Sequence, residues 1–138
     1  MEDQGYEFSE AQNEVILNLS KKMNFLGMIL VIIAFVYFAT AVYPLTKSGT
    51  PTGFIIGTVI SHIIAGALYV AIGLFTIKAS KSFRLIVQTQ GSDIKNLMDA
   101  LAFLLKQYSV QYWVVILALI FLGIAFIAIL LIKGIPAL

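Results

Sequence analysis

The amino-acid sequence predicts an all-α membrane protein with three transmembrane helices and two amphipathic helices at one membrane surface. Of the 138 residues, 60% are hydrophobic and 12% are charged, whereas soluble domains carry about 25% charged residues. The apolar residues gather in three runs of roughly 20, a length that crosses the ~30 Å hydrocarbon core of a bilayer. We therefore expect residues 1–138 to form a single membrane domain.

The N-terminal part is predicted to lead into the membrane along one surface. Residues 1–8 are polar and acidic, and we expect a flexible tail without the basic stretch that begins a signal peptide. Residues 9–22 are predicted to form an amphipathic helix, because Ser9 and Gln12 have the spacing of a capping box. From Val15 onward, apolar side chains recur about every four residues, as on one face of a helix.

Two apolar runs then predict the first and second spans. The first covers residues 23–43, and Pro44 ends it because proline cannot donate to the helical hydrogen-bond ladder. Residues 44–52 form a short loop rich in turn-forming residues. The second span covers residues 53–77.

A second amphipathic helix is predicted over residues 92–110, with Ser92 as its cap. Its apolar residues follow the i, i+3, i+4, i+7 pattern of one helix face. They are Ile94, Leu97, Met98, Leu101, Leu104, Leu105 and Tyr108. Phe103 projects from the opposite, polar side. We favour a helix that lies flat on the bilayer; the alternative is a docking platform with Phe103 as an exposed aromatic anchor for a partner. The third span, residues 112–132, begins with Tyr112 and Trp113, which suit the aromatic belt of a membrane interface.

The basic residues predict the orientation of these spans. Three spans place the N-terminus and residues 78–111 on the same side, which holds seven of the nine Lys and Arg residues. The seven are Lys21, Lys22, Lys78, Lys81, Arg84, Lys95 and Lys106. Because basic residues near spans are retained in the cytoplasm, we expect this side to be cytoplasmic and the C-terminus to be outside or lumenal.

Small residues indicate where helices approach each other closely. Gly53, Gly57, Ser61 and Ala65 recur every four residues, a spacing that lets two helix backbones come together in a membrane. This ridge predicts packing against the chain's own first or third span, or against a second copy or a partner's helix, and the sequence leaves both open.

A second group of small residues has a different spacing. Gly27, Ala34 and Ala41 recur every seven residues, which suits left-handed packing within one bundle. Ala118 and Ala125 in the third span have the same spacing. In the second span, Gly66 and Gly73 are also expected to be helix-packing residues.

His62, the only histidine, lies inside the second span, where an ionisable side chain is a candidate functional residue. Gly66 and Gly73 on its stripe would leave room for a flat ligand such as a tetrapyrrole, whose iron commonly takes an axial imidazole. The alternative, which we favour, is a neutral histidine hydrogen-bonded to the first span, with Tyr37 or Thr40 as its partner.

Several function classes lack the residues that they need. The predicted spans contain no Asp, Glu, Lys or Arg, which ion-coupled transporters normally require. Paired carboxylates, nucleophile–base pairs, phosphate loops and metal-ligand clusters are missing, and there are no cysteines. We therefore expect no catalytic residue, no metal, no soluble substrate and, with a net charge of only +2, no nucleic-acid partner.

Two segments resemble a family of small bacterial three-span membrane proteins of unknown function. In that family a D-x-x-x-L-x-x-A-L-x-x-L-x-x-x-[YF] segment leads into the last span, and an earlier span opens with K-x-x-x-L-G. The matching residues are Asp93, Leu97, Ala100, Leu101, Leu104 and Tyr108 for the first motif, and Lys22, Leu26 and Gly27 for the second. The resemblance covers about residues 20–132 and implies the three-span architecture without assigning a site.

These patterns predict a non-enzymatic accessory or scaffold subunit that packs within a larger membrane complex. Its partners would be the lipid bilayer and other membrane-protein subunits, or further copies of itself. One alternative is a membrane-shaping homo-oligomer that uses its interfacial amphipathic helices. Another is a tetrapyrrole-binding subunit that uses His62; otherwise we expect no cofactor.

Overall fold

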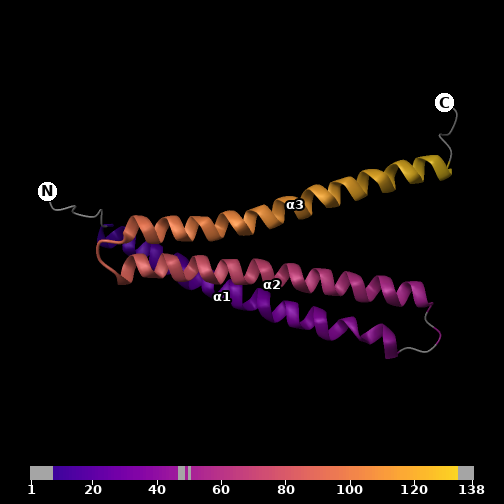
Figure 1. Cartoon of the computed structure of the whole chain (residues 1–138), viewed down its shortest axis with the longest axis horizontal. Helices are drawn as coiled ribbons and strands as arrows, with labels where there is room; N and C mark the ends of the chain where they lie inside the picture. Colours follow the sequence, from indigo (N-terminus) through magenta and orange to yellow (C-terminus); the bar gives the residue numbers. More distant parts are fainter. Residues whose placement is uncertain (1–7, 47–48, 50, 134–138) are drawn as a thin grey trace. The chain divides into compact units, whose positions relative to one another are not determined.

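The computed structural model describes residues 8–46, 49 and 51–133, and in these residues it is helical throughout, without strands. The elements are α1 (Glu10–Ala41), the short 3₁₀ turn η1 (Tyr43–Thr46), α2 (Thr52–Gln88) and α3 (Asp93–Lys133) (Figure 1). The tail predicted for residues 1–8 lies, except for Phe8, outside the described residues.

The three α-helices are long and apolar enough to cross a membrane, as the sequence predicted. They contain 32, 37 and 41 residues, which at 1.5 Å per residue gives lengths of about 48, 56 and 62 Å. The predicted spans 53–77 and 112–132 lie inside α2 and α3. The predicted span 23–43 lies in α1 up to Ala41 and extends two residues beyond it, to the start of η1. Because the hydrocarbon core is only ~30 Å thick, each helix is long enough to continue well beyond it.

The two separate amphipathic helices of the prediction are not found. Residues 10–22 are the first turns of α1, and residues 93–110 are the first turns of α3. The physical reason is the absence of a helix breaker: neither residues 10–26 nor residues 93–122 contain a glycine or proline, so nothing interrupts the hydrogen-bond ladder where the predicted helices were to end.

The helix ends follow local signals in the sequence. At the start of α1 the capping box is present: the Ser9 amide donates to Gln12 Oε1 at 2.8 Å, and the Gln12 amide donates to Ser9 Oγ at 3.5 Å. Helix α2 continues to Gln88, and the turn into α3 passes through Gly91 at φ +72°, a backbone conformation that side chains other than glycine rarely adopt.

The chain forms two compact units, Met1–Gln107 and Tyr108–Leu138, which we call unit 1 and unit 2. The described part of unit 2 is the later part of α3. Most of its apolar side chains are exposed, and the Tyr112 and Trp113 rings meet edge to face with centroids 5.7 Å apart.

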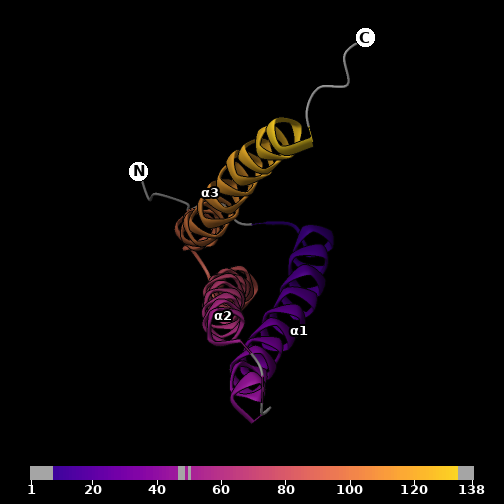
Figure 2. The ribbon, with the colours of Figure 1, turned by 90° about the vertical axis from the view of Figure 1, so that its right-hand side faces the viewer.

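In unit 1, α1 and α2 form an antiparallel pair joined by η1 and the following loop (Figures 1 and 2). The pair meets along a seam of small buried residues that recur every seven positions. They are Ser20, Gly27, Ala34 and Ala41 on α1, and Gly66, Gly73 and Ser80 on α2. A Cβ atom on Gly27 would lie 2.9 Å from the backbone oxygen of Gly73, and a Cβ atom on Gly73 would lie 2.9 Å from that of Gly27. The glycines thus allow backbone-to-backbone contact.

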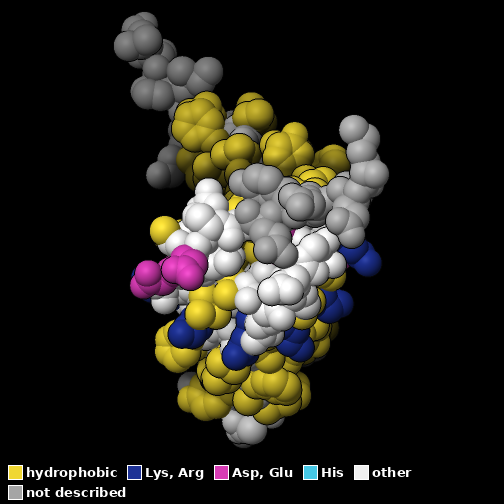
Figure 3. All heavy atoms as spheres, turned by 90° about the vertical axis from the view of Figure 1, so that its left-hand side faces the viewer, with side chains coloured by type: hydrophobic (Ala, Val, Ile, Leu, Met, Phe, Trp, Pro, Cys, Tyr) yellow, Lys and Arg dark blue, Asp and Glu magenta, His cyan; other side chains and the backbone are white. Residues whose placement is uncertain are grey.

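At the other end from the loop, the starts of α1 and α3 and the end of α2 pack together, and we call this region the basic end. Its core consists of Phe83, Ile86 and Ala100, with Phe8, Ile16, Met23, Leu97 and Leu104 packed against it. Lysine and arginine side chains lie around this end of the molecule (Figure 3). They include Lys21, Lys22, Lys78, Lys81, Arg84, Lys95 and Lys106, all of which are exposed.

Candidate functional site

The small residues of α2 lie on two opposite faces, and only one face packs against α1. Gly66 and Gly73 belong to the packed face. A Cβ atom on Gly66 would meet the Phe38 ring at 2.5 Å, and one on Gly73 would meet Val31 Cγ2 at 2.9 Å. Both glycines are therefore helix-packing residues within the α1–α2 pair.

Gly57 lies nine residues before Gly66, which at 100° per residue places it on the opposite face of α2. A Cβ atom on Gly53 or Gly57 would meet no described atom within 4 Å. Ser61 is exposed, with its hydroxyl donating to Thr58 O at 2.9 Å, and Ala65 is half-buried. This face, which we call the open ridge, is not covered by α1.

The half-buried His62 forms its hydrogen bond within α2 and not, as we expected, with α1. Its Nδ1 lies 2.8 Å from Thr58 O, and because a carbonyl oxygen only accepts, Nδ1 must carry the hydrogen. In the tautomer with its hydrogen on Nδ1, the imidazole has an acceptor lone pair on Nε2. Tyr37 contacts His62 through its ring, with centroids 5.8 Å apart, and stacks on Tyr69 at 5.3 Å.

The slot that we expected for a flat ligand beside His62 is filled. The Phe38 ring occupies the space over Gly66, and the α1 backbone at Gly27 occupies the space over Gly73. Glycine is needed at both positions for helix packing, so neither position provides room for a tetrapyrrole.

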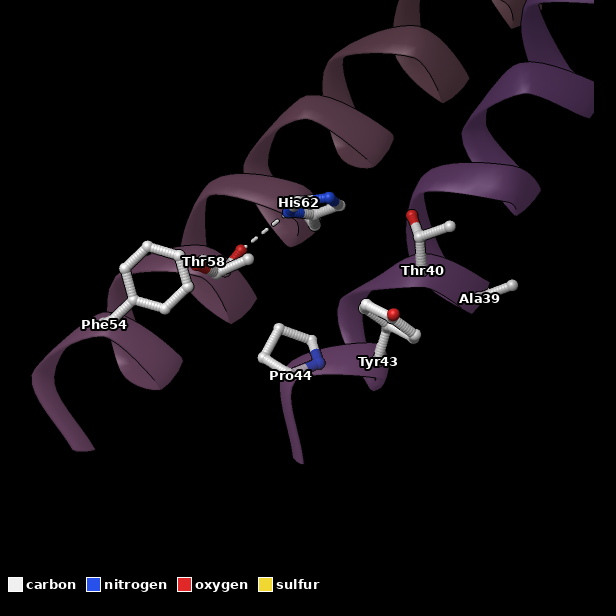
Figure 4. A pocket seen from close by; sticks show the side chains of 7 residues that line it. All are labelled: Ala39, Thr40, Tyr43, Pro44, Phe54, Thr58 and His62. Carbon is white, nitrogen blue, oxygen red and sulfur yellow. Dashed lines mark hydrogen bonds between the residues drawn. The ribbon is translucent and has the colours of Figure 1, made fainter. Parts of the chain in front are cut away.

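Space is instead found on the other side of His62, toward the loop. A pocket of about 500 Å³ lies between the end of α1, η1 and the first turns of α2 (Figure 4). It is lined by Ala39, Thr40, Tyr43, Pro44, Phe54, Thr58 and His62. Most of this lining is apolar, and the His62 ring extends from α2 toward α1 at its inner edge (Figure 4). We call this site the loop-end pocket.

Phe103 is half-buried and not exposed as its place on the polar side of the helix predicted, and its role as a docking anchor stays a prediction. The ammonium groups of Lys78 and Lys106 lie 5.7 and 5.5 Å from its ring centroid. Both distances are within the range of cation–π attraction. The side chain therefore joins α2 to α3 in unit 1.

The buried face of α3 carries polar residues whose burial the sequence did not predict. Asp93 and Asn96 are 3% and 8% exposed. Asp93 Oδ2 accepts from the Phe8 amide at 2.9 Å, and Asn96 Nδ2 donates to Thr89 Oγ1 at 3.0 Å. Farther along, Gln107 Oε1 accepts from Thr76 Oγ1 at 2.9 Å.

The apolar side chains between these residues face outward. Ile94, Met98 and Leu101 are 52%, 59% and 45% exposed. The polar residues of an amphipathic helix normally lie on the side that faces water. Here the polar face of α3 is turned inward, and only the long-range hydrogen-bond partners of Asp93, Asn96 and Gln107 reveal this orientation.

Within the described residues, no three Asp, Glu, His or Cys side chains come together as a metal site. No family model, curated protein or solved structure matches the chain. The resemblance to the small bacterial three-span family therefore stays a prediction, and functional inference depends on the open ridge, the outward face of α3 and the loop-end pocket.

Proposed function

We propose that the chain is a non-enzymatic accessory subunit that packs in the membrane against a helix of a larger complex. The observation that carries this proposal is the open ridge of α2. The α1–α2 seam demonstrates that glycines in this helix are used for close backbone contact, and the open ridge repeats the same kind of surface on the opposite face without a partner from α1.

A partner helix would pack against the open ridge more closely than lipid chains can. Small side chains let backbones approach, so that many weak contacts and Cα–H···O interactions form together. Gly53 and Gly57 lie at the loop end of α2, one helical turn apart, and Ser61 continues the ridge by another turn.

The outward apolar residues of α3 supply a second contact surface for the same complex. Ile94, Met98 and Leu101 share one side of the helix at the basic end, where lysines flank them. In the proposed orientation this end is cytoplasmic, following the distribution of basic residues, and the surface would meet a cytoplasmic part of the partner.

Two alternatives, a membrane-shaping homo-oligomer and a tetrapyrrole-binding subunit, stay predictions, and we favour the accessory role over both. The residues expected to form interfacial helices, 10–22 and 93–107, are turns of the long helices that pack at the basic end. The space over Gly66 that we expected to be open to a tetrapyrrole holds the Phe38 ring.

The test uses the variant Gly57→Leu, which places a large side chain on the open ridge without a clash in unit 1. The matched control is Ala67→Leu, an exposed position of α2 that lies about 80° around the helix from Gly57. We expect Gly57→Leu to lose the proteins that co-purify with the wild-type chain from native membranes in mild detergent, and Ala67→Leu to keep them. Retention of the same partners by both variants would contradict the proposal.

A further inference from the structure

We propose that the loop-end pocket binds a lipid-soluble hydroxylated aromatic molecule of the phenol or hydroquinone class, whose hydroxyl donates to His62 Nε2. This site is separate from the open ridge, and it does not depend on the accessory role. The proposal rests on the volume and lining of the pocket, on the tautomer of His62 and on the aromatic residues near the pocket mouth.

The size and lining of the pocket suit a small apolar ligand. Its volume of about 500 Å³ lies within the ~300–1,000 Å³ range of small-molecule sites. Ala39, Tyr43 and Phe54 at its rim are exposed, so a ligand dissolved in the membrane can enter sideways between α1 and α2. Such sites combine apolar walls with a few polar groups that orient the ligand.

His62 determines which polar group the ligand must present. Its Nδ1 donates to Thr58 O at 2.8 Å, and in this tautomer Nε2 is the acceptor that remains for a ligand. Thr40 Oγ1 lies 2.9 Å from Val36 O and 3.1 Å from Tyr37 O, so its single hydrogen is also committed inside α1. Both groups can therefore accept a hydrogen bond from a hydroxyl of the ligand. A ligand carbonyl, which only accepts, would find no donor hydrogen on either of them.

The aromatic residues favour a flat ring as the apolar body of the ligand. Phe54 from α2 and Tyr43 from η1 lie on opposite sides of the pocket, with Pro44 between them (Figure 4). A ring held between two aromatic side chains gains offset or edge-to-face contacts beyond simple burial. An aliphatic lipid chain would fill the volume without these contacts and without using His62.

The experiment measures binding of three matched probes to the full chain in lipid nanodiscs. They are a decyl-substituted dimethoxy-methyl-hydroquinone, its di-O-methyl ether, which has no donor, and the corresponding quinone, whose oxygens only accept. We expect the hydroquinone to bind about tenfold more tightly than the other two, the effect of one well-placed hydrogen bond. Equal binding of the three probes would overturn the proposal.

Two variants localise the binding. His62→Phe keeps a ring and removes the acceptor, so the hydroquinone should lose its advantage and bind no more tightly than the ether. Ala39→Leu fills the pocket and should weaken all three probes, whereas Ala67→Leu, outside the pocket, should leave them unchanged. Because Ala39 is exposed, its variant tests the site even if His62→Phe does not fold.

Two further results would overturn the proposal. Hydroquinone binding that none of these substitutions alters would indicate simple partition into the lipid. A tetrapyrrole absorbance band in the chain purified from native membranes, lost in His62→Phe, would assign the histidine to a different ligand.

Discussion

Replacing Gly73 with alanine tests the backbone-to-backbone contact between α1 and α2. The added Cβ atom would lie 2.9 Å from both Gly27 O and Val31 Cγ2, whereas comfortable carbon–oxygen contacts begin near 3.3 Å. The helices must therefore separate by roughly half an ångström. Overpacking of this kind costs about 1–3 kcal/mol, and the better helix propensity of alanine offsets about 1 kcal/mol of that cost.

The matched control is Gly57→Ala on the open ridge, where the new Cβ atom meets nothing within 4 Å. Only the helix propensity changes there, so the control should be as stable as the parent chain or more stable by up to ~1 kcal/mol. We expect the two variants to differ by about 2 kcal/mol in the free energy of unfolding.

The assay is unfolding by sodium dodecyl sulfate in mixed micelles, followed by the loss of helical circular dichroism. A double variant, Gly27→Ala with Gly73→Ala, adds a check: its effect should be smaller than the sum of the single effects, because either alanine alone already separates the same pair of helices. If Gly73→Ala and Gly57→Ala unfold at the same detergent fraction, the α1–α2 seam described here is wrong.

Three further predictions concern other parts of the protein. Phe103→Ala removes a half-buried ring and two cation–π contacts, and should lower the free energy of unfolding by about 2 kcal/mol; unchanged stability in the same assay would contradict its role in joining α2 to α3. Ser80→Ala removes the buried hydrogen bond to Ser20 O at 2.8 Å and should lower the free energy of unfolding by about 1 kcal/mol. Ser61→Ala, on the open ridge, should lower it by less than about 0.5 kcal/mol. Equal losses in the two variants would count against the α1–α2 seam. The chain has no cysteines, so Leu45→Cys and Gln90→Cys report orientation: an impermeant maleimide applied to intact cells should label only the first, and the reverse pattern would invert the proposed topology.

Local sequence signals predicted the parts of the fold that depend on neighbouring residues. The capping box at Ser9 needs only a residue three positions away. The three spans follow from apolar runs of sufficient length. The seven-residue spacing of Gly27, Ala34 and Ala41 likewise marks the face of α1 that is buried, because the period of a helix determines which side chains share a face.

The remaining features depend on residues far apart in the chain. Gly57 and Gly66 are equally small, and only Phe38 on the other helix determines that one is packed and the other open. The polar face of α3 was predicted to face water, and this prediction was wrong for the same reason. Asp93 is turned inward by its hydrogen bond to the Phe8 amide, 85 positions away in the sequence. The loop-end pocket also requires η1 and α2 together, so no single segment indicates it.

The measurement that tests the central proposal most directly is the mass and subunit composition of the complex extracted from native membranes in a mild detergent. The account predicts that the chain is accompanied by a different membrane protein in a fixed ratio, and that Gly57→Leu abolishes this association. Recovery of the chain alone, as a monomer or as a pure homo-oligomer, would contradict the accessory role.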